Sequence, residues 1–156
     1  MLHLNIPGYK DLRLEHLVLD FNGTLACDGQ LIPGVKQLLE ALAPKLHLHL
    51  LTADTFGSVK EQVAGLPVSL HVIAPGREAQ AKADYLQALG PEKTAAIGNG
   101  RNDGLMLQQA ALGVAVLQSE GLAVEALLAA HVITPGILEA LELLLYPQRL
   151  QATLRW

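Results

Sequence analysis

The sequence predicts an α/β fold, in which a doubly wound, mainly parallel sheet carries a layer of helices on each face. Apolar runs of strand length alternate with amphipathic runs of helix length along most of the 156 residues. Gly, Pro or Asp residues separate these runs, as at Pro75-Gly76 and Pro135-Gly136. Hydrophobic residues make up 51% of the chain and aromatic residues only 4%, so the core is aliphatic, as in sheets that are covered on both faces.

The elements follow a rhythm of strand and then helix, after a short N-terminal segment that can form an edge strand. Strands are predicted at residues 15–21, 46–52, 69–74, 94–97, 113–117 and 131–134. Helices are predicted at residues 35–43, 56–64, 78–89, 102–111, 122–130 and 137–145. Because β-α-β crossovers are right-handed, the strands form one parallel sheet in a three-layer α/β/α arrangement. Ligands bind at the carboxyl ends of such strands, so function is expected there.

Length and composition exclude several kinds of protein. The length fits a single domain over residues 1–156, and no repeat or linker interrupts the pattern. A net charge of −4 without a basic stripe predicts neither a nucleic-acid partner nor an anionic membrane partner. Cys27 is the only cysteine, which excludes an internal disulfide and fits a reducing compartment. The N-terminal segment lacks a signal-peptide pattern, so we expect a cytoplasmic protein.

The strand at 15–21 leads into the segment Asp20-Phe21-Asn22-Gly23-Thr24. A carboxylate at this position is exposed at the rim of the sheet. Gly23 permits a tight turn, and the hydroxyl and amide of Thr24 can hold phosphate oxygens. The alternative is an ordinary Asp-Asn-Gly turn at the end of a strand.

The strand at 46–52 ends in Thr52-Ala53-Asp54, which places a second hydroxyl on the same rim. This signal is weak by itself, because Thr followed by Asp is also a good start for a helix. His47 and His49 share one face of this strand, a spacing that can chelate a transition metal but is more typical of histidines near a sheet edge.

Lys82 lies in the helix predicted at 78–89, just before the fourth strand. A lysine there can reach the rim as a point charge against a phosphate or the Asp20 carboxylate. The alternative is a solvated surface lysine, with Arg77 or Lys93 in its place at the site.

The fourth strand is followed by Gly98-Asn99-Gly100-Arg101-Asn102-Asp103. The glycines let the chain turn closely around a ligand. Asn99, Asn102 and Asp103 supply the oxygen ligands that Mg²⁺ prefers. A glycine-rich turn that is capped by Asp103 is the structural alternative.

These four segments resemble the four motifs of the haloacid dehalogenase superfamily, in order and in spacing, over residues 14–145. Within the superfamily they are most similar to the soluble P-type-ATPase-like proteins. The resemblance implies a phosphatase in which Asp20 attacks a phosphate monoester, forms an aspartyl-phosphate and is released by water. Asn22, Thr52 and Lys82 would be the other catalytic residues.

The resemblance also implies two sets of ligands. The phosphate-binding set is Asp20, Gly23, Thr24, Thr52, Ala53, Lys82 and Asn102. The cofactor is Mg²⁺, and its ligands would be Asp20, the backbone carbonyl of Asn22, Asn99 and Asp103.

Two positions depart from the pattern of the superfamily. Asn22 replaces the Asp that protonates the leaving group and later activates water, and Asn99 replaces a charged magnesium ligand. We therefore expect slow turnover, weak magnesium affinity and a long-lived aspartyl-phosphate. The rival function is a weakened module that binds phosphate, or is phosphorylated, and acts through a partner. A plain scaffold whose polar strand ends are only turns and caps is the third alternative.

Neither gap between the motifs is long enough for a cap domain. Only residues 26–33 follow the first motif before a helix, and one βα unit separates Thr52 from Lys82. An open rim accepts a small-molecule or exposed macromolecular phosphate ester, or is closed by a neighbouring subunit of a homo-oligomer.

Overall fold

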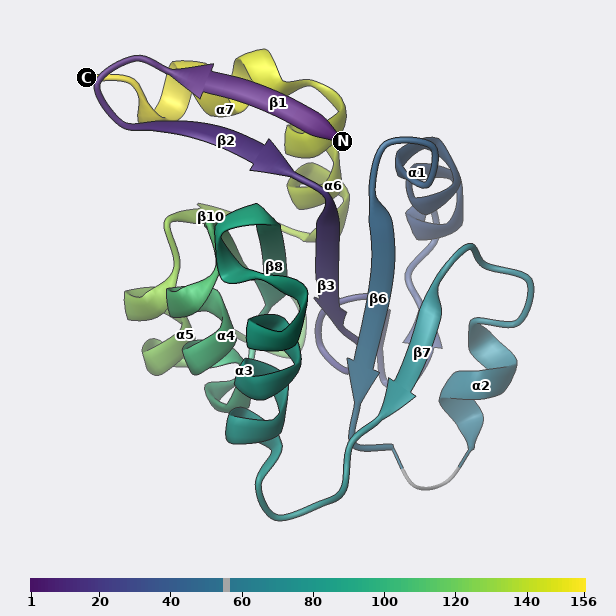
Figure 1. The fold of residues 1–156 in the computed structure, drawn as a ribbon. Coiled ribbons are helices and arrows are strands. Elements are labelled where there is room, and N and C mark those ends of the chain that lie inside the picture. The colour runs from purple at the N-terminus through teal and green to yellow at the C-terminus, as the bar shows by residue number, and fades with distance from the viewer. Residues whose placement is uncertain (55–56) are drawn as a thin grey trace.

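A central sheet of six parallel strands organises the molecule (Figure 1). The computed structural model describes residues 1–54 and 57–156. The strand order is β10-β9-β8-β3-β6-β7, and every neighbouring pair is parallel. The strands are β3 (His16–Asp20), β6 (His47–Thr52), β7 (Ser69–Val72), β8 (Thr94–Gly98), β9 (Leu112–Val116) and β10 (Val132–Thr134). The predicted α/β fold and all six predicted strands are confirmed.

Helices cover both faces of this sheet. Successive strand residues point to opposite faces, so Leu17 and Leu19 pack in one core and Val18 in the other. The first core is closed by α1 (Val35–Leu42) and α6 (Ile137–Leu145). The second is closed by α3 (Glu78–Leu89), α4 (Gly104–Gln109) and α5 (Val124–Ala129), which lie together in Figure 1. The chain is therefore doubly wound, as predicted.

The N-terminal segment does not add an edge strand to this sheet, so that expectation is wrong. β1 (Leu2–Ile6) and β2 (Lys10–Leu14) form a separate antiparallel pair. Alternate residues of the pair are buried in the core that α6 closes. The C-terminal tail forms α7 (Pro147–Leu154), which lies along β1 and donates from the Gln151 side chain to the Asn5 carbonyl at 2.9 Å. The apolar alternation shows only that one face of this segment is buried, and that face packs in the core beside α6 and α7.

Short elements fill the remaining gaps. The segment after the first motif forms the hairpin of β4 (Ala26–Cys27) and β5 (Gln30–Leu31). The helix predicted at 56–64 is α2 (Ser58–Gln62), and its predicted start at Phe56 lies outside the described residues. The helix predicted from residue 102 is preceded by a 3₁₀ turn, η2 (Arg101–Asp103), and another 3₁₀ turn, η1 (Pro91–Lys93), precedes β8. No cap domain interrupts the described parts of the chain, and no described helix is long and apolar enough to cross a membrane.

The histidines of the sheet bond to one another and to α3. His16 and His49 share a hydrogen bond of 3.0 Å between Nδ1 and Nε2, and His49 Nδ1 lies 2.9 Å from the Tyr85 hydroxyl. That hydroxyl also lies 2.6 Å from His71 Nε2. Among the described residues, no group of three or more His, Cys, Asp and Glu side chains could hold a metal ion. The histidines thus fasten α3 to β3, β6 and β7.

The point at which the strand order changes direction, the topological switch point, predicts where ligands bind. From β3 the chain proceeds to β6 and β7 on one side, and then returns to place β8 on the other side of β3. In open α/β sheets, ligands occupy the crevice at the carboxyl ends of the strands beside such a reversal. The ends of β3 and β8 are therefore the expected place for the site.

We predict that the folded state becomes less stable as pH is lowered, because His49 is buried in its neutral form. Burial, together with the charges of His16, His71 and His47, lowers the pKa of His49 to about 4. A folded-state pKa below the unfolded value means that the unfolded chain binds more protons between about pH 6.5 and pH 4. The contribution of His49 to stability is fully present above this window and is lost as pH falls through it.

After discounting for solvent screening, the expected loss from pH 7 to pH 5 is about 1 kcal/mol. Urea unfolding of the wild type and of His49→Gln at both pH values measures it. His49→Gln is expected to lose less stability than the wild type over this interval, and equal losses would contradict the assignment.

Candidate active site

One lysine joins two carboxylates at the carboxyl ends of β3 and β8. Lys82 Nζ lies 2.7 Å from Asp20 Oδ1 and 2.6 Å from Asp103 Oδ1. The Lys82 side chain is 1% exposed and that of Asp103 is 0% exposed, so solvent barely screens these contacts. Residues from β3, α3 and η2, which are distant in sequence, thus meet at one point, as the sequence motifs predict.

The charges of this cluster do not balance. Burial raises the pKa of Asp20, the Asp103 charge adds to this, and Lys82 opposes it, with the result that the pKa is raised to about 7. Burial lowers the pKa of Lys82, but the charges of Asp20 and Asp103 outweigh this and hold it above its ordinary value. Two buried carboxylates facing one ammonium leave a surplus of one negative charge when both are ionised.

The turn after β3 holds Asp20 in place. The Thr24 hydroxyl lies 3.1 Å from Asp20 Oδ2 and 3.2 Å from Asn99 Oδ1, and the Thr24 amide donates to the Phe21 carbonyl at 3.1 Å. Gly23 has a φ of 78°, and a Cβ atom there would collide with the Asn99 side chain. Both donors of Thr24 are thus used within the protein, and its role in holding phosphate stays a prediction.

Asp103 holds the loop after β8. Its Oδ2 accepts the backbone N–H groups of Asn99 at 3.0 Å and Gly100 at 2.8 Å, while Oδ1 faces Lys82. A Cβ atom on Gly98 would collide with this carboxylate. Asp103 is fully buried and does not line the adjacent cavity, so the structure shows it positioning Lys82 and the loop, and its predicted role as a magnesium ligand stays a prediction.

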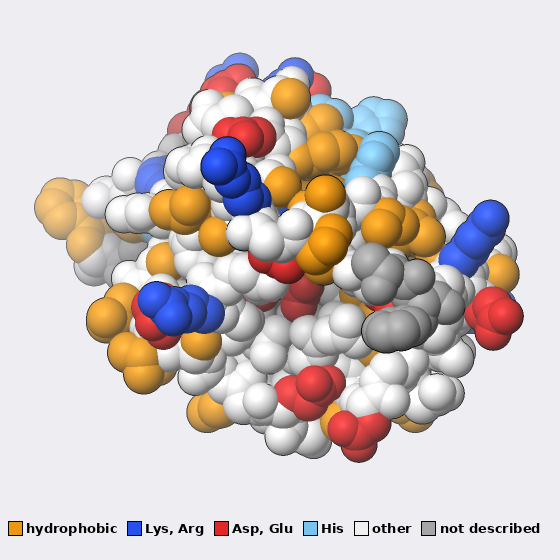
Figure 2. Space-filling view, turned by 90° about the horizontal axis from the view of Figure 1, so that it is seen from below, with side chains coloured by type: hydrophobic (Ala, Val, Ile, Leu, Met, Phe, Trp, Pro, Cys, Tyr) orange, Lys and Arg blue, Asp and Glu red, His pale blue; other side chains and the backbone are white. Residues whose placement is uncertain are grey.

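A cavity of about 510 Å³ opens above the cluster, and we call it the central cavity. Its lining residues are Asp20, Asn22, Thr52, Ala53, Asp54, Ser58, Lys82, Asn99, Gly100 and Asn102. Figure 2 looks onto this end of the sheet and shows acidic side chains recessed in a hollow near its centre. Most of the predicted site residues therefore face one space. The exceptions are Gly23, Thr24 and Asp103, which lie behind it.

Polar groups at the mouth of the central cavity differ in how firmly they are held. Thr52 is buried, and its hydroxyl accepts the Asp54 N–H at 3.1 Å. Asp54 Oδ2 accepts from the Ser58 hydroxyl at 2.9 Å and the Val59 N–H at 3.1 Å, which places it at the start of α2. Asn22 and Asn102 are exposed, and within the described residues neither side chain has a hydrogen-bond partner. These two amides are therefore free to meet a ligand.

The sequence did not mark Gln118 as part of the site. Its Nε2 donates to the carbonyls of Gly23 at 2.9 Å and Thr24 at 2.7 Å, and its Oε1 accepts the Ile137 N–H at 3.0 Å. Gln118 thus ties the turn after β3 to the start of α6. The available signal was a polar residue just after an apolar strand, which was the same signal that identified Asp20 and Asn99.

The alternatives to Lys82 do not reach the cluster. Lys93 pairs with Glu15 at 3.1 Å beside the start of β3, at the opposite end of that strand from Asp20. Arg77 lines a neighbouring cavity and not the central one. The surface-lysine alternative for Lys82 is wrong, because the side chain is buried.

Sequence comparisons with known proteins point to one family. The model of a family described as haloacid dehalogenase-like hydrolase matches residues 72–135. An uncharacterized protein of Methanocaldococcus jannaschii is 42% identical over 84 residues, which are 51% of this chain and 90% of that protein. A phosphoserine phosphatase of Idiomarina loihiensis is 50% identical over 44 residues, which are 24% of this chain and only 20% of that protein.

The fold also matches solved structures. One is the 3-deoxy-D-manno-octulosonate 8-phosphate phosphatase of Moraxella catarrhalis, described in complex with magnesium ion, phosphate ion and KDO. It has 21% sequence identity and a TM-score of 0.66, and the match covers 90% of each chain.

We predict that Lys82→Met destabilises the protein by about 3–5 kcal/mol at pH 7, because it leaves two buried carboxylates without their cation. Denaturant unfolding measures the change. Lys36→Met is the matched control, since Lys36 is an exposed lysine of α1 whose removal is expected to change stability by about 0.5 kcal/mol or less. Equal stabilities of the two variants would show that the buried pairing does not support the fold.

Proposed function

The chain belongs to the haloacid dehalogenase superfamily, and we propose that it is a magnesium-dependent phosphatase that acts through an aspartyl-phosphate on Asp20. The observation that carries the proposal is the Asp20-Lys82-Asp103 cluster, in which Asp20 and Lys82 line the central cavity and Asp103 lies behind them. The phosphatases among its relatives and structural neighbours support it. The similarity to the soluble P-type-ATPase-like proteins stays a prediction.

Asp20 is the proposed nucleophile. Its Oδ1 is held by Lys82 and its Oδ2 by Thr24, so both oxygens are fixed at the cavity floor. Attack of one oxygen on phosphorus forms the O–P bond as the bond to the leaving oxygen breaks, and water later cleaves the acyl-phosphate. The Lys82 ammonium stabilises the charge of the transferring group. The Thr52 hydroxyl and the Asn102 amide, which line the same cavity, are the proposed donors to its other oxygens.

The donor set at the cavity fits a hard divalent cation. Asp20, the Asn22 carbonyl and Asn99 Oδ1 are oxygen ligands of the kind Mg²⁺ prefers, and Asp20, Asn22 and Asn99 all line the central cavity. The negative surplus of the buried cluster also favours a cation. When bound, Mg²⁺ would supply positive charge that keeps Asp20 ionised and neutralises phosphate oxygens. Asn99 lacks a charge, so we propose that magnesium affinity is low.

Asn22 is proposed to limit the rate. Its side chain is exposed at the mouth of the cavity, where a leaving group and an incoming water would pass. An amide can orient water and donate a hydrogen bond, but it cannot transfer a proton at neutral pH. Turnover is then slow and the aspartyl-phosphate long-lived.

The same two amides favour a second candidate function. With Asn22 and Asn99 in place of carboxylates, the chain could bind phosphate or hold a phosphoryl group on Asp20 and act through a partner. Beryllofluoride bound in the presence of Mg²⁺, together with no hydrolysis of an aryl phosphate, would favour this function. Hydrolysis that depends on Asp20 favours the phosphatase.

We predict that Asp20→Asn lowers aryl phosphate hydrolysis by about 10³-fold or more, because the amide cannot attack phosphorus. Chelation with EDTA is expected to abolish wild-type activity, and added Mg²⁺ to restore it. Asp84→Asn is the matched control, since Asp84 is an exposed residue of α3 that bonds only to Gln80 among the described side chains. Activity retained by Asp20→Asn would refute the proposed nucleophile.

We also predict that Asn22→Asp raises turnover at saturating Mg²⁺ by about 10²- to 10⁴-fold, because it restores a group that can exchange protons. Steady-state hydrolysis of the same aryl phosphate measures the effect, and circular dichroism checks the fold. Turnover that is unchanged or lower in a folded variant contradicts the role given to this position.

A further inference from the structure

A second cavity, of about 830 Å³, adjoins the central one, and we call it the side cavity. Its volume lies within the range of about 300–1,000 Å³ that is usual for small-molecule sites. The two cavities share Gly100 and Asn102 in their walls. A molecule whose phosphate lies in the central cavity therefore has room for its remaining atoms in the side cavity.

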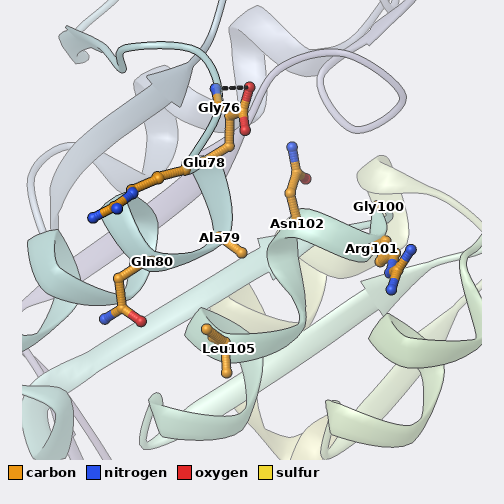
Figure 3. A pocket seen from close by; sticks show the side chains of 9 residues that line it. Gly76, Glu78, Ala79, Gln80, Gly100, Arg101, Asn102 and Leu105 are labelled. Carbon is orange, nitrogen blue, oxygen red and sulfur yellow. Dashed lines mark hydrogen bonds between the residues drawn. The ribbon is translucent and has the colours of Figure 1, made fainter.

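The side cavity lies between two segments that join the sheet to its helices. One wall is residues 76–80, at the start of α3, and the other is formed by residues 100–102 and Leu105 of α4. Figure 3 shows the Asn102 side chain projecting into the space between these walls, with Leu105 on α4 beneath it. Ala79 and Leu105 add an apolar surface on which a short carbon skeleton can pack.

Two guanidinium groups line this space. The Arg77 side chain has no hydrogen-bond or ion-pair partner within residues 1–54 and 57–156. Arg101 pairs through Nε with Glu125 Oε1 at 3.2 Å, and Glu125 is not among the residues that line the side cavity. The terminal nitrogens of Arg101 thus remain as donors, as does the Asn102 amide. Arginine forks of this kind match the oxygens of carboxylates and phosphates.

The one carboxylate in the lining is turned toward the backbone. Glu78 Oε1 accepts the Gly76 N–H at 3.1 Å, a bond that Figure 3 draws. The Gln80 side-chain amide nitrogen donates to Asp84 Oδ1 at 2.7 Å, so this donor is also occupied within the protein. The donors that remain for a ligand are therefore mostly those of the two arginines, and these select for a negatively charged group.

We propose that the side cavity holds the leaving group of the substrate, and that this group carries a second anion, a carboxylate or a phosphate, bound by a guanidinium group of the cavity wall, that of Arg77 or that of Arg101. The inference rests on the proposed function, because it takes the central cavity as the site of the transferred phosphate. It narrows the substrate from any phosphate ester to small esters with a second acidic group.

Three phosphonates test this without turnover, because their C–P bonds are not hydrolysed. Propylphosphonate has no second anion, 3-phosphonopropanoate adds a carboxylate and propane-1,3-bisphosphonate adds a phosphonate. In calorimetry with Mg²⁺, the wild type is expected to bind one or both of the probes with a second acidic group about 10- to 100-fold more tightly than propylphosphonate. This is the gain that one charged hydrogen bond supplies. The stronger of the two shows whether the second anion is a carboxylate or a phosphate.

The double variant Arg77→Gln/Arg101→Gln is expected to lose this preference. Arg13→Gln is the matched control, because Arg13 is an exposed arginine of β2, on the hairpin at the other end of the molecule, and it should retain the preference. Equal binding of the probes by the wild type, a preference that survives in the double variant, or binding of none of the three overturns the inference. Failure of the proposed function is distinct, since it appears as the absence of Asp20-dependent hydrolysis.

Discussion

The ammonium of Lys82 between two buried carboxylates is the constraint on which the site depends. A buried charge is tolerated only when it is paired, so the three side chains must stay together in the folded state. Asp20 ends β3, Lys82 lies in α3 and Asp103 ends η2, so this pairing sets the position of the helix relative to two strand ends. The bonds of Tyr85 to His49 and His71, one turn further along the same face of α3, hold the helix to β6 and β7.

The pairing of Lys82 with Asp20 and Asp103 also explains why the turn after β3 and the loop after β8 have a fixed conformation at the carboxyl edge of the sheet. Asp103 accepts two backbone N–H groups with the oxygen that Lys82 does not use, which orders the segment from Asn99 to Gly100. Thr24 performs the corresponding task for Asp20. Each buried polar group therefore orients one that faces the central cavity, and Gln118 links the turn after β3 to α6. Preorganisation of this kind lets a few exposed groups act on a ligand without a reordering of the loop.

Much of this arrangement could be predicted from the sequence. The bounds of α3 and α6 agree with the prediction, because flanking Gly and Pro residues mark both helices and apolar periodicity marks α6. Asp20 and Asn99 were placed together because the carboxyl ends of parallel strands share an edge. The inward direction of Thr24 and the role of Gln118 could not be predicted, since they depend on which partner each side chain meets across the sheet. The N-terminal hairpin was misplaced because an apolar alternation shows that one face is buried but not against what.

The two asparagines act on the charge of the site as well as on its chemistry. The pKa of Asp20 is already raised to about 7 by burial and by Asp103, despite Lys82. An ionised carboxylate at position 22 or 99 would add negative charge beside Asp20 and oppose its ionisation further. Under the proposed function, amides at these positions would forgo proton transfer and a charged metal ligand, but they spare Asp20 this repulsion. Under the proposed function, the site would trade the rate of the steps after attack for an Asp20 carboxylate that ionises with less positive charge nearby.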